Sequence, residues 1–157
     1  TIRVGVVGVG HLGQHHALDA LHDLEELCFA ERRFRRDHIL WILKNPRAST
    51  FVYENGGVVA ALMVLNERDL TRVLSIGVHP RHRRHGIGRD LMAVAEDVAR
   101  RQRKDEVRLE VNTKNEGAIA FYQSLGYDLL ERLPGYYSWG DDAYAMAKPV
   151  APAARNP

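Results

Sequence analysis

The sequence predicts an α/β fold in which a mixed, mostly antiparallel sheet of six to seven strands is combined with about four helices. Strand-like apolar runs alternate along the chain with segments whose apolar residues recur at helical spacing. The turn Asn55-Gly56-Gly57 separates two of these runs, which is a strong hairpin signal because such turns need positive φ. A basic, glycine-containing loop joins another run to the longest predicted helix.

Length and composition predict one soluble domain over residues 1–148, followed by a flexible tail over 149–157. The single cysteine, Cys28, excludes an intrachain disulfide, which favours a cytoplasmic location. The longest apolar run, Val58–Leu65, is far shorter than the roughly 20 residues that span a bilayer. We therefore expect no membrane partner, and no secretory signal is recognised. The net charge of +2 gives no reason to expect a nucleic-acid partner. We expect a monomer or a homodimer.

The N-terminal part of the chain predicts one strand followed by two helices. Ile2–Val9 is β-branched and apolar, as in a buried strand. The apolar residues that follow at helical spacing are Ala17, Leu18, Leu21, Leu24 and Cys28. A second, short helix is predicted over Arg35–Leu43 and ends before Pro46, because proline disfavours helical geometry in the residue that precedes it.

The middle of the chain predicts a hairpin and then a strand that leads into the longest helix. Ser49–Tyr53 and Val58–Leu65 flank the glycine turn and are expected to pair antiparallel. Val73–Val78 is the next predicted strand. The predicted buried face of the longest helix comprises Ile87, Leu91, Val94, Ala95 and Val98.

The C-terminal part predicts a strand, a helix and two closing strands. Val107, Leu109 and Val111 alternate with polar residues, as in a half-buried strand. The helical stripe that follows comprises Ala118, Phe121, Tyr122 and Leu125. Tyr127–Leu130 and Ala143–Ala147 are expected to complete the sheet.

The segment Val78–Arg89 has the composition and the position of a phosphate-binding loop. It lies between a strand and a long helix and contains Arg83, Arg84, Gly86 and Gly88. Glycines let the backbone approach an anion, and the first N–H groups of a helix point outward with the positive end of the helix dipole. A diphosphate is therefore the expected ligand, although a glycine turn with solvated arginines would have the same composition.

This loop resembles the signature of the GNAT superfamily of N-acetyltransferases, in which Gln or Arg is followed after two residues by Gly, one residue, and Gly or Ala. Arg83, Gly86 and Gly88 match that pattern. The resemblance runs from about Leu18 to Lys148 and implies the GNAT fold, with a splayed central pair of strands and with acetyl-CoA as the acetyl donor. The resemblance assigns the coenzyme pantetheine and pyrophosphate to Ile76, Gly77, Val78, Arg83, Arg84, His85, Gly86, Ile87, Gly88 and Arg89.

Within that superfamily, Leu109–Tyr127 looks like the ribosomal-protein alanine acetyltransferase type. Gly135-Tyr136-Tyr137 followed by Asp141-Asp142 is also similar to that branch, in which a tyrosine pair helps to hold a peptide N-terminus. The resemblance therefore implies a protein N-terminal amine as the acceptor. A small-molecule amine, a lysine side chain or a non-catalytic acyl-CoA-binding module remain alternatives, because function follows the site rather than the fold.

Two residues are predicted to be catalytic. Glu110 lies out of phase with the buried positions of its strand and could accept the amine proton, through water; the alternative is a solvated carboxylate. Tyr122 lies on the apolar stripe of its helix and could give a proton to the coenzyme thiolate; the alternative is a tyrosine that only packs in the core. A backbone N–H near Val78 is expected to stabilise the oxyanion.

The remaining candidates concern the coenzyme and the acceptor. Asn115 is placed to cap the helix that follows it, and the resemblance adds a contact with the coenzyme. The candidates for the acceptor groove are Phe29, Glu31, Tyr136 and Tyr137, each of which could instead pack against neighbouring helices.

Two other patterns compete with this interpretation. Residues 2–17, with Gly8, Gly10 and Gly13, resemble the start of the glucose-fructose oxidoreductase family and its dinucleotide fingerprint. The ribose-binding acid expected about 20 residues later is missing, so a nicotinamide site is not expected. Histidines cluster at His79, His82 and His85 and at His11, His15 and His16, but neither group has cysteine or carboxylate neighbours at zinc-like spacing, so we expect no metal.

Overall fold

The computed structural model describes the backbone of residues 3–6, 11–29 and 35–151, and the side chains of residues 17–29 and 35–151. The chain divides into two compact units. The first unit comprises Thr1–Leu65 and Leu74–Ala95, and the second comprises Asn66–Val73 and Glu96–Pro157. Strand β4 and helix α3 each contribute residues to both units. The domain boundaries expected from the sequence stay a prediction.

The first unit contains the N-terminal side of the sheet. In spatial order its strands are β1 (Arg3–Val6), β2 (Ala48–Glu54), β3 (Val58–Asn66) and the end of β4 (Leu70–Val78). β2 and β3 pair antiparallel across the predicted turn, where Gly56 and Gly57 have φ values of 70° and 142° and the N–H of Asn55 donates to the carbonyl of Gly57. The hairpin prediction is confirmed.

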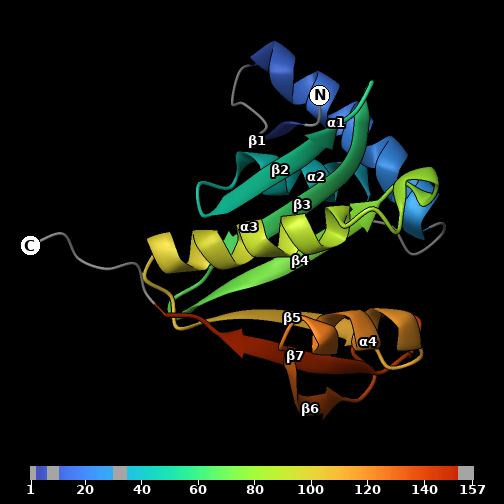
Figure 1. Cartoon of the computed structure of the whole chain (residues 1–157). Coiled ribbons are helices and arrows are strands. Elements are labelled where there is room, and N and C mark those ends of the chain that lie inside the picture. Colours follow the sequence, from blue (N-terminus) through green and yellow to red (C-terminus); the bar gives the residue numbers. More distant parts are fainter. Residues whose placement is uncertain (1–2, 7–10, 30–34, 152–157) are drawn as a thin grey trace, which may run out of the picture. The chain divides into compact units, whose positions relative to one another are not determined.

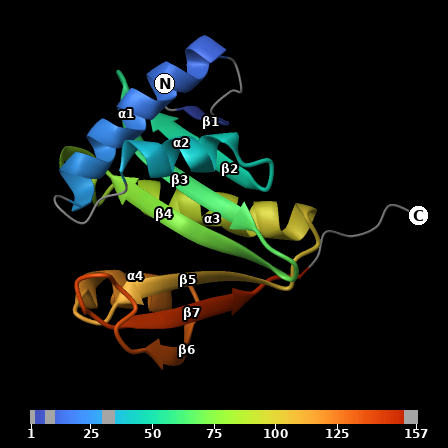
Figure 2. The ribbon, with the colours of Figure 1, turned by 180° about the vertical axis from the view of Figure 1, so that it is seen from behind.

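Two helices cover one face of these strands. Helices α1 (His11–Phe29) and α2 (Arg36–Lys44) lie on one side of β2 and β3, and the start of α3 (Ile87–Arg101) lies on the other side (Figures 1 and 2). The core between α1, α2 and the strands contains Leu18, Leu21, Leu24, Ile39, Val52 and Ala61. The three leucines are those that the helical spacing had predicted to be buried.

The pairing of β1 separates this chain from a dinucleotide-binding fold. β1 runs antiparallel to β2, with Val4 opposite Tyr53. A dinucleotide-binding unit instead places its first two strands parallel, joined by a crossover helix. The expectation that residues 2–17 do not form a nicotinamide site agrees with this geometry, although Gly8 and Gly10 lie outside the described residues.

The second unit contains the C-terminal side of the sheet. β4 pairs in parallel with β5 (Glu106–Asn112) over Leu70–Arg72, and β5 pairs antiparallel with β7 (Ala143–Pro149). β6 (Asp128–Leu133) pairs with β7 and forms the edge, and α4 (Glu116–Ser124) lies beside β5 and β7 (Figure 1). Val107, Leu109 and Val111 are buried and alternate with half-buried polar residues, as predicted for this strand.

Helix α3 buries a charge that its apolar spacing did not indicate. Glu96 is almost fully buried, although the predicted apolar face passes on either side of it. Its carboxylate accepts a hydrogen bond from the Tyr127 hydroxyl at 3.2 Å and another from Lys148 Nζ at 2.8 Å. A buried carboxylate is tolerated when it is paired and hydrogen-bonded in this way, so Glu96 ties α3 to β7 and to the start of β6.

Within the described part of the chain, we find no helix with both the length and the apolar character that crossing a membrane requires.

The α1 core allows a matched test of the packing in the first unit. Leu21 is 1% exposed and Leu27, on the same helix, is 55% exposed. We expect Leu21→Ala to lower the free energy of unfolding by about 3–5 kcal/mol, because it leaves a cavity, and Leu27→Ala to change it by no more than about 0.5 kcal/mol. Urea denaturation followed by circular dichroism measures both values. Equal losses in the two variants would show that α1 does not pack through the face that carries Leu18, Leu21 and Leu24.

Candidate active site

The site residues predicted from the sequence are distributed over both units. The residues expected to bind the coenzyme, apart from Asn115, lie in the first unit, and the expected catalytic residues Glu110 and Tyr122 lie in the second. Phe29 belongs to the first unit, and Tyr136 and Tyr137 belong to the second.

The predicted phosphate loop is a turn that connects the end of β4 to the start of α3. A short 3-10 helix, η2 (Pro80–His82), follows β4, and α3 begins at Ile87. Arg84 and Gly86 both have positive φ, 67° and 79°. Such a backbone turns sharply, and the first N–H groups of α3, which have no acceptor within the helix, face out of the turn. The loop therefore has the backbone geometry of an anion site.

The charge of the loop has the sign that an anion requires. Arg81, Arg84, His85 and Arg89 are exposed side chains of this short stretch. Arg83 is held differently, because its Nε donates to the carbonyl of Val78 at 2.9 Å. Arg83 therefore fixes the loop to the end of β4, while the other arginines add positive potential near the start of α3, where the helix dipole has the same sign.

The end of β4 lies tightly against the end of α1. A Cβ atom on Gly77 would lie 3.2 Å from Cys28 Sγ and 3.3 Å from Phe29 Cε2, so a larger residue here would require these side chains to shift by a few tenths of an ångström. Cys28 donates a weak hydrogen bond to the Val78 carbonyl, and burial raises the pKa of its thiol. Phe29 is thus placed beside the predicted coenzyme strand, whereas Glu31 lies outside the described residues.

Glu110 projects from the polar face of β5 and is paired with an arginine. Its side chain forms an ion pair with Arg72 of β4, and Arg72 also forms two hydrogen bonds with Glu67, at 2.9 and 3.2 Å. The side chain of Glu110 is only 11% exposed. The alternation correctly placed Glu110 off the core face, but the simple solvated carboxylate considered from the sequence does not describe its surroundings. Its role as a base stays a prediction.

Tyr122 is buried on α4 among other aromatic rings. Its ring lies 5.3 Å from that of Phe121 and 6.1 Å from that of Tyr127, measured between centroids. Burial raises the pKa of Tyr122 to about 12, with a smaller contribution from the nearby Tyr137. The hydroxyl therefore stays protonated at neutral pH and has a proton that it can donate.

Asn115 caps α4. Its side-chain oxygen accepts a hydrogen bond from the N–H of Ala118 at 3.1 Å, which satisfies one of the free donors at the helix start. The predicted cap is observed. The contact with the coenzyme that the resemblance adds stays a prediction.

The loop between β6 and β7 carries the two candidate tyrosines and is held by two aspartates. Asp141 accepts hydrogen bonds from Lys114, Asn112 and Trp139, at 2.8, 2.9 and 2.8 Å. These donors, Lys114 first, hold the pKa of Asp141 well below its usual range. The ring of Tyr137 stacks on Trp139 at 4.7 Å and contacts Tyr136 edge to face at 5.1 Å. The aromatic cluster of Tyr136, Tyr137 and Trp139 is therefore held by its own ring contacts and by the hydrogen bond from Trp139 to Asp141.

Asp142 closes the base of the same loop. It accepts hydrogen bonds from Arg132 at 2.9 and 2.7 Å and from the N–H of Gly135 at 2.8 Å. The anchoring roles of Asp141 and Asp142, and the ion pair of Arg72, were missed at the level of the sequence. Two adjacent aspartates after an aromatic loop are a usable signal, whereas nothing local marks Arg72.

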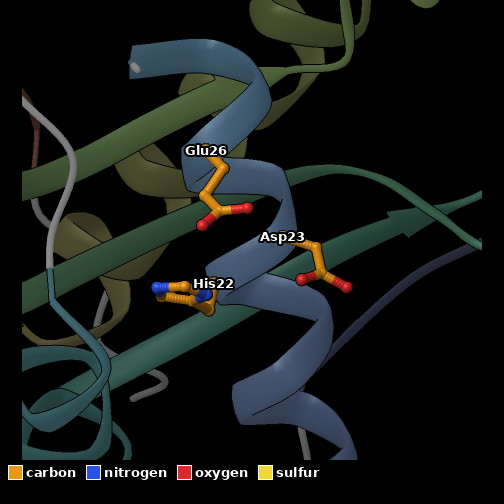
Figure 3. Close-up of side chains that lie close together, drawn as sticks. All are labelled: His22, Asp23 and Glu26. Carbon is orange, nitrogen blue, oxygen red and sulfur yellow. The ribbon is translucent and has the colours of Figure 1, made fainter. Parts of the chain in front are cut away.

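One group of possible metal ligands lies elsewhere among the described residues, on α1. Ligand atoms of His22, Asp23 and Glu26 lie within 4.8 Å of one another (Figure 3). Asp23 and Glu26 are exposed, and an ordinary polar helix face produces the same spacing, so we assign no metal to this group. His79, from the predicted histidine cluster, uses Nδ1 to accept the N–H of Arg81 and thereby supports the turn after β4.

Comparison with known proteins gives a family match. The sequence profile of the Acetyltransferase (GNAT) family matches residues 18–127, more than half of the chain. The N-alpha-acetyltransferase of Sulfurisphaera tokodaii is 39% identical over 122 residues, which cover 69% of this chain and 73% of that protein. The N-alpha-acetyltransferase of Saccharolobus solfataricus is 39% identical over 79 residues, which cover 50% of this chain and 47% of that protein. The chain thus spans about half the length of several curated relatives that it matches.

A solved structure shares the fold. The crystal structure of the ribosomal-protein-S18-alanine N-acetyltransferase from Escherichia coli has a TM-score of 0.82 to this chain at 25% identity, with coverage of 100% of this chain and 99% of that chain. The predicted fold class is confirmed. None of these matches supports the dinucleotide-binding resemblance of residues 2–17, and the family profile begins after that segment.

The anchoring of the β6–β7 loop by Asp141 can be tested directly. We expect Asp141→Ala to accelerate cleavage by chymotrypsin after Tyr136, Tyr137 or Trp139, because the variant removes three side-chain hydrogen bonds. Asp128→Ala, at the exposed start of β6, is the control. Limited proteolysis read by mass spectrometry gives the rates and the sites. If the two variants are cut equally fast, the loop is held by other contacts and the anchoring role of Asp141 is wrong.

Proposed function

Because this chain belongs to the Acetyltransferase (GNAT) family, we propose that it transfers the acetyl group of acetyl-CoA to the α-amino group of a protein N-terminus by direct attack. The observation that carries this proposal is the match to an N-alpha-acetyltransferase over more than two thirds of both chains. The basic turn between β4 and α3 and the tyrosine loop between β6 and β7 support it. A cytoplasmic location and the oligomeric state stay predictions.

The coenzyme pyrophosphate is proposed to bind the turn that begins α3. The N–H groups across Arg84–Arg89 are the donors, and the exposed arginines supply the counter-charge. Backbone groups of Ile76–Val78 would pair with the pantetheine arm. The oxyanion would be stabilised by an N–H group near Val78, because an oxyanion needs a hydrogen-bond donor. The Val78 carbonyl is an acceptor, and it receives hydrogen bonds from Arg83 and Cys28.

The chemistry requires one proton to leave the amine and one to reach the coenzyme sulfur. In the proposed step, the amine nitrogen attacks the thioester carbon while its proton passes to Glu110 through a water molecule. The carbonyl oxygen becomes an oxyanion, the C–S bond then breaks, and the electron pair leaves with the sulfur. Glu110 suits this task because a carboxylate that is held on a strand and shielded from most of the solvent can accept a proton in a fixed direction.

Tyr122 is proposed to act on the sulfur as the C–S bond breaks. Since its pKa is raised to about 12, it enters the step as the neutral phenol and donates its hydroxyl proton, in a hydrogen bond or completely, to the departing thiolate. The acceptor peptide is proposed to contact Phe29, Tyr136 and Tyr137, together with Glu31. Exposed aromatic side chains such as Tyr136 fit a substrate whose first side chains are bound through apolar area.

The first test is coenzyme binding by calorimetry. We expect acetyl-CoA and CoA to bind in the micromolar range and NADH not to bind. Gly86→Asp should weaken acetyl-CoA binding at least about tenfold, equivalent to about 1.4 kcal/mol, because it places a negative charge in the anion site. Gly56→Asp is the matched control, since Gly56 also has positive φ and open space around it. NADH binding without acetyl-CoA binding would overturn the proposal.

The acceptor is tested next, with panels of N-terminal peptides, free lysine and small amines. Turnover with α-amino groups but not with side-chain amines supports the N-terminal acceptor. Turnover only with small amines or lysine would replace that acceptor class, and tight coenzyme binding without any turnover would indicate an acyl-CoA-binding module.

Tyr122→Phe tests the proposed acid. We expect kcat to fall about 10²- to 10⁴-fold, the usual contribution of a proton donor. We also expect wild-type kcat to show no alkaline loss near pH 10, because the pKa of Tyr122 is raised to about 12 and the phenol stays protonated below that pH. Tyr144→Phe, a half-buried tyrosine on β7, is the control. Steady-state rates across pH give both results. An unchanged kcat in Tyr122→Phe would contradict the assignment of Tyr122 as the acid, whereas an alkaline loss near pH 10 that disappears in that variant would contradict only the raised pKa.

A further inference from the structure

We propose that Arg72 is a positioning residue for the Glu110 carboxylate, and that Glu67 in turn orients Arg72. This inference rests on the proposed function, in which Glu110 is the base. The three side chains all belong to the second compact unit. Glu67 precedes β4, Arg72 lies in β4 and Glu110 lies in β5.

The guanidinium of Arg72 is held at two edges. Its Nε donates to Glu67 Oε1 at 2.9 Å and its Nη2 donates to Glu67 Oε2 at 3.2 Å. Its Nη1 forms the ion pair with Glu110 Oε1. Because the guanidinium is planar and rigid, a fork on one carboxylate sets the direction of the remaining nitrogen. Glu67 therefore aims Nη1 at Glu110, which a flexible lysine ammonium could not reproduce.

Glu67 is itself fixed by the turn before β4. Its N–H donates to the carbonyl of Leu70 at 2.9 Å. The adjacent Asn66 accepts a hydrogen bond from the Thr71 hydroxyl at 2.7 Å, and Thr71 is fully buried. The series of contacts from Glu67 through Arg72 to Glu110, called the relay below, therefore begins in a turn whose backbone and side chains are already constrained. Such constraint is the condition for holding a reactive group in a defined orientation.

Exposure falls along the relay, from 36% for Glu67 to 23% for Arg72 and 11% for Glu110. An ionised carboxylate that is so far removed from water needs a compensating charge to remain ionised. Arg72 supplies that charge on one oxygen. A carboxylate has two oxygens, so contact at Oε1 leaves Oε2 able to accept the proton through water.

A neighbouring ion pair between an arginine and a glutamate, which is not part of the proposed positioning of Glu110, provides a control. Arg108 forms two hydrogen bonds with Glu106 of its own strand, at 3.2 and 3.1 Å, and Arg108 is the register partner of Arg72. The two arginines thus form the same kind of fork at paired positions of β4 and β5, and within the described part of the chain the ion pair of Arg108 is with Glu106. Arg108→Met is therefore the matched control for the loss of one ion pair in β4 and β5.

The experiment measures kcat and KM for acetyl transfer to an N-terminal peptide. We expect Arg72→Met to lower kcat on the order of 10- to 100-fold, the cost of a misplaced catalytic group, with little change in the KM for acetyl-CoA. Arg72→Lys should recover only part of that loss, and Arg108→Met should keep the wild-type kcat. Thermal unfolding of each variant establishes that it is folded.

A double-mutant cycle separates positioning from a general structural effect. Adding Arg72→Met to Glu110→Gln should lower kcat no further, because Arg72 acts through Glu110. In addition, guanidinium at millimolar concentration should raise the kcat of Arg72→Ala but not that of the Arg72→Ala, Glu110→Gln double variant. If Arg72→Met does not fold, Glu67→Gln decides instead, since it leaves the Arg72–Glu110 pair intact and should still lower kcat by loosening it.

The outcomes distinguish a failure of the proposal for Arg72 from a failure of the proposed function. If Glu110→Gln is slow while Arg72→Met and Glu67→Gln keep the wild-type kcat, or if the two losses simply add, the proposal for Arg72 is wrong and the proposed function stands. If Glu110→Gln keeps the wild-type kcat, or the wild type transfers no acetyl group, the base assignment or the function has failed and the proposal for Arg72 fails with it.

Discussion

The hydrogen bonding of strand β4 is the constraint on which the candidate active site depends. The backbone groups inside a strand must be paired, so a strand can contribute chemistry only through its side chains and at its ends. The start of β4 pairs with β5, and from it Arg72 reaches Glu110. The end of β4 passes into the basic turn, where the Val78 carbonyl accepts donors from Arg83 and Cys28. Strand β4 therefore contributes a contact to the proposed base within the second unit and another to the proposed pyrophosphate loop within the first unit.

Charges near the candidate site are compensated by residues distant in the sequence. Glu96 is paired with Lys148 and Tyr127, and Asp141 with Lys114 and Asn112. Such pairs add little net stability when exposed, and they only offset the desolvation cost when buried. Their consequence here is directional, because the pairs of Asp141 hold the loop that carries Tyr136 and Tyr137, and Glu96 ties α3 to β7.

Patterns that depend on neighbours in the chain were sufficient for most of the fold. The alternation around Val107 predicted β5, and the Asn55-Gly56-Gly57 turn predicted the β2–β3 hairpin, because both signals arise from local backbone geometry. The burial of Glu96 could not be predicted, since helical spacing marks apolar residues and cannot show that a cation and a hydroxyl will neutralise a carboxylate. The start of β4 was placed at Val73, whereas the strand begins at Leu70, where pairing with β5 extends it.

The sequence by itself determined the order of helices and strands, the basic turn at the start of α3 and the polar face on which Glu110 lies. These follow from periodicity, from glycine at positive φ and from arginines clustered within a few residues, all of which act over short distances. Only the tertiary structure decided that Arg72 forms an ion pair with Glu110 and that Asp141 accepts hydrogen bonds from Asn112, Lys114 and Trp139. Alternation indicates the face that a side chain occupies, but its partner comes from another strand or loop, and that choice depends on strand register.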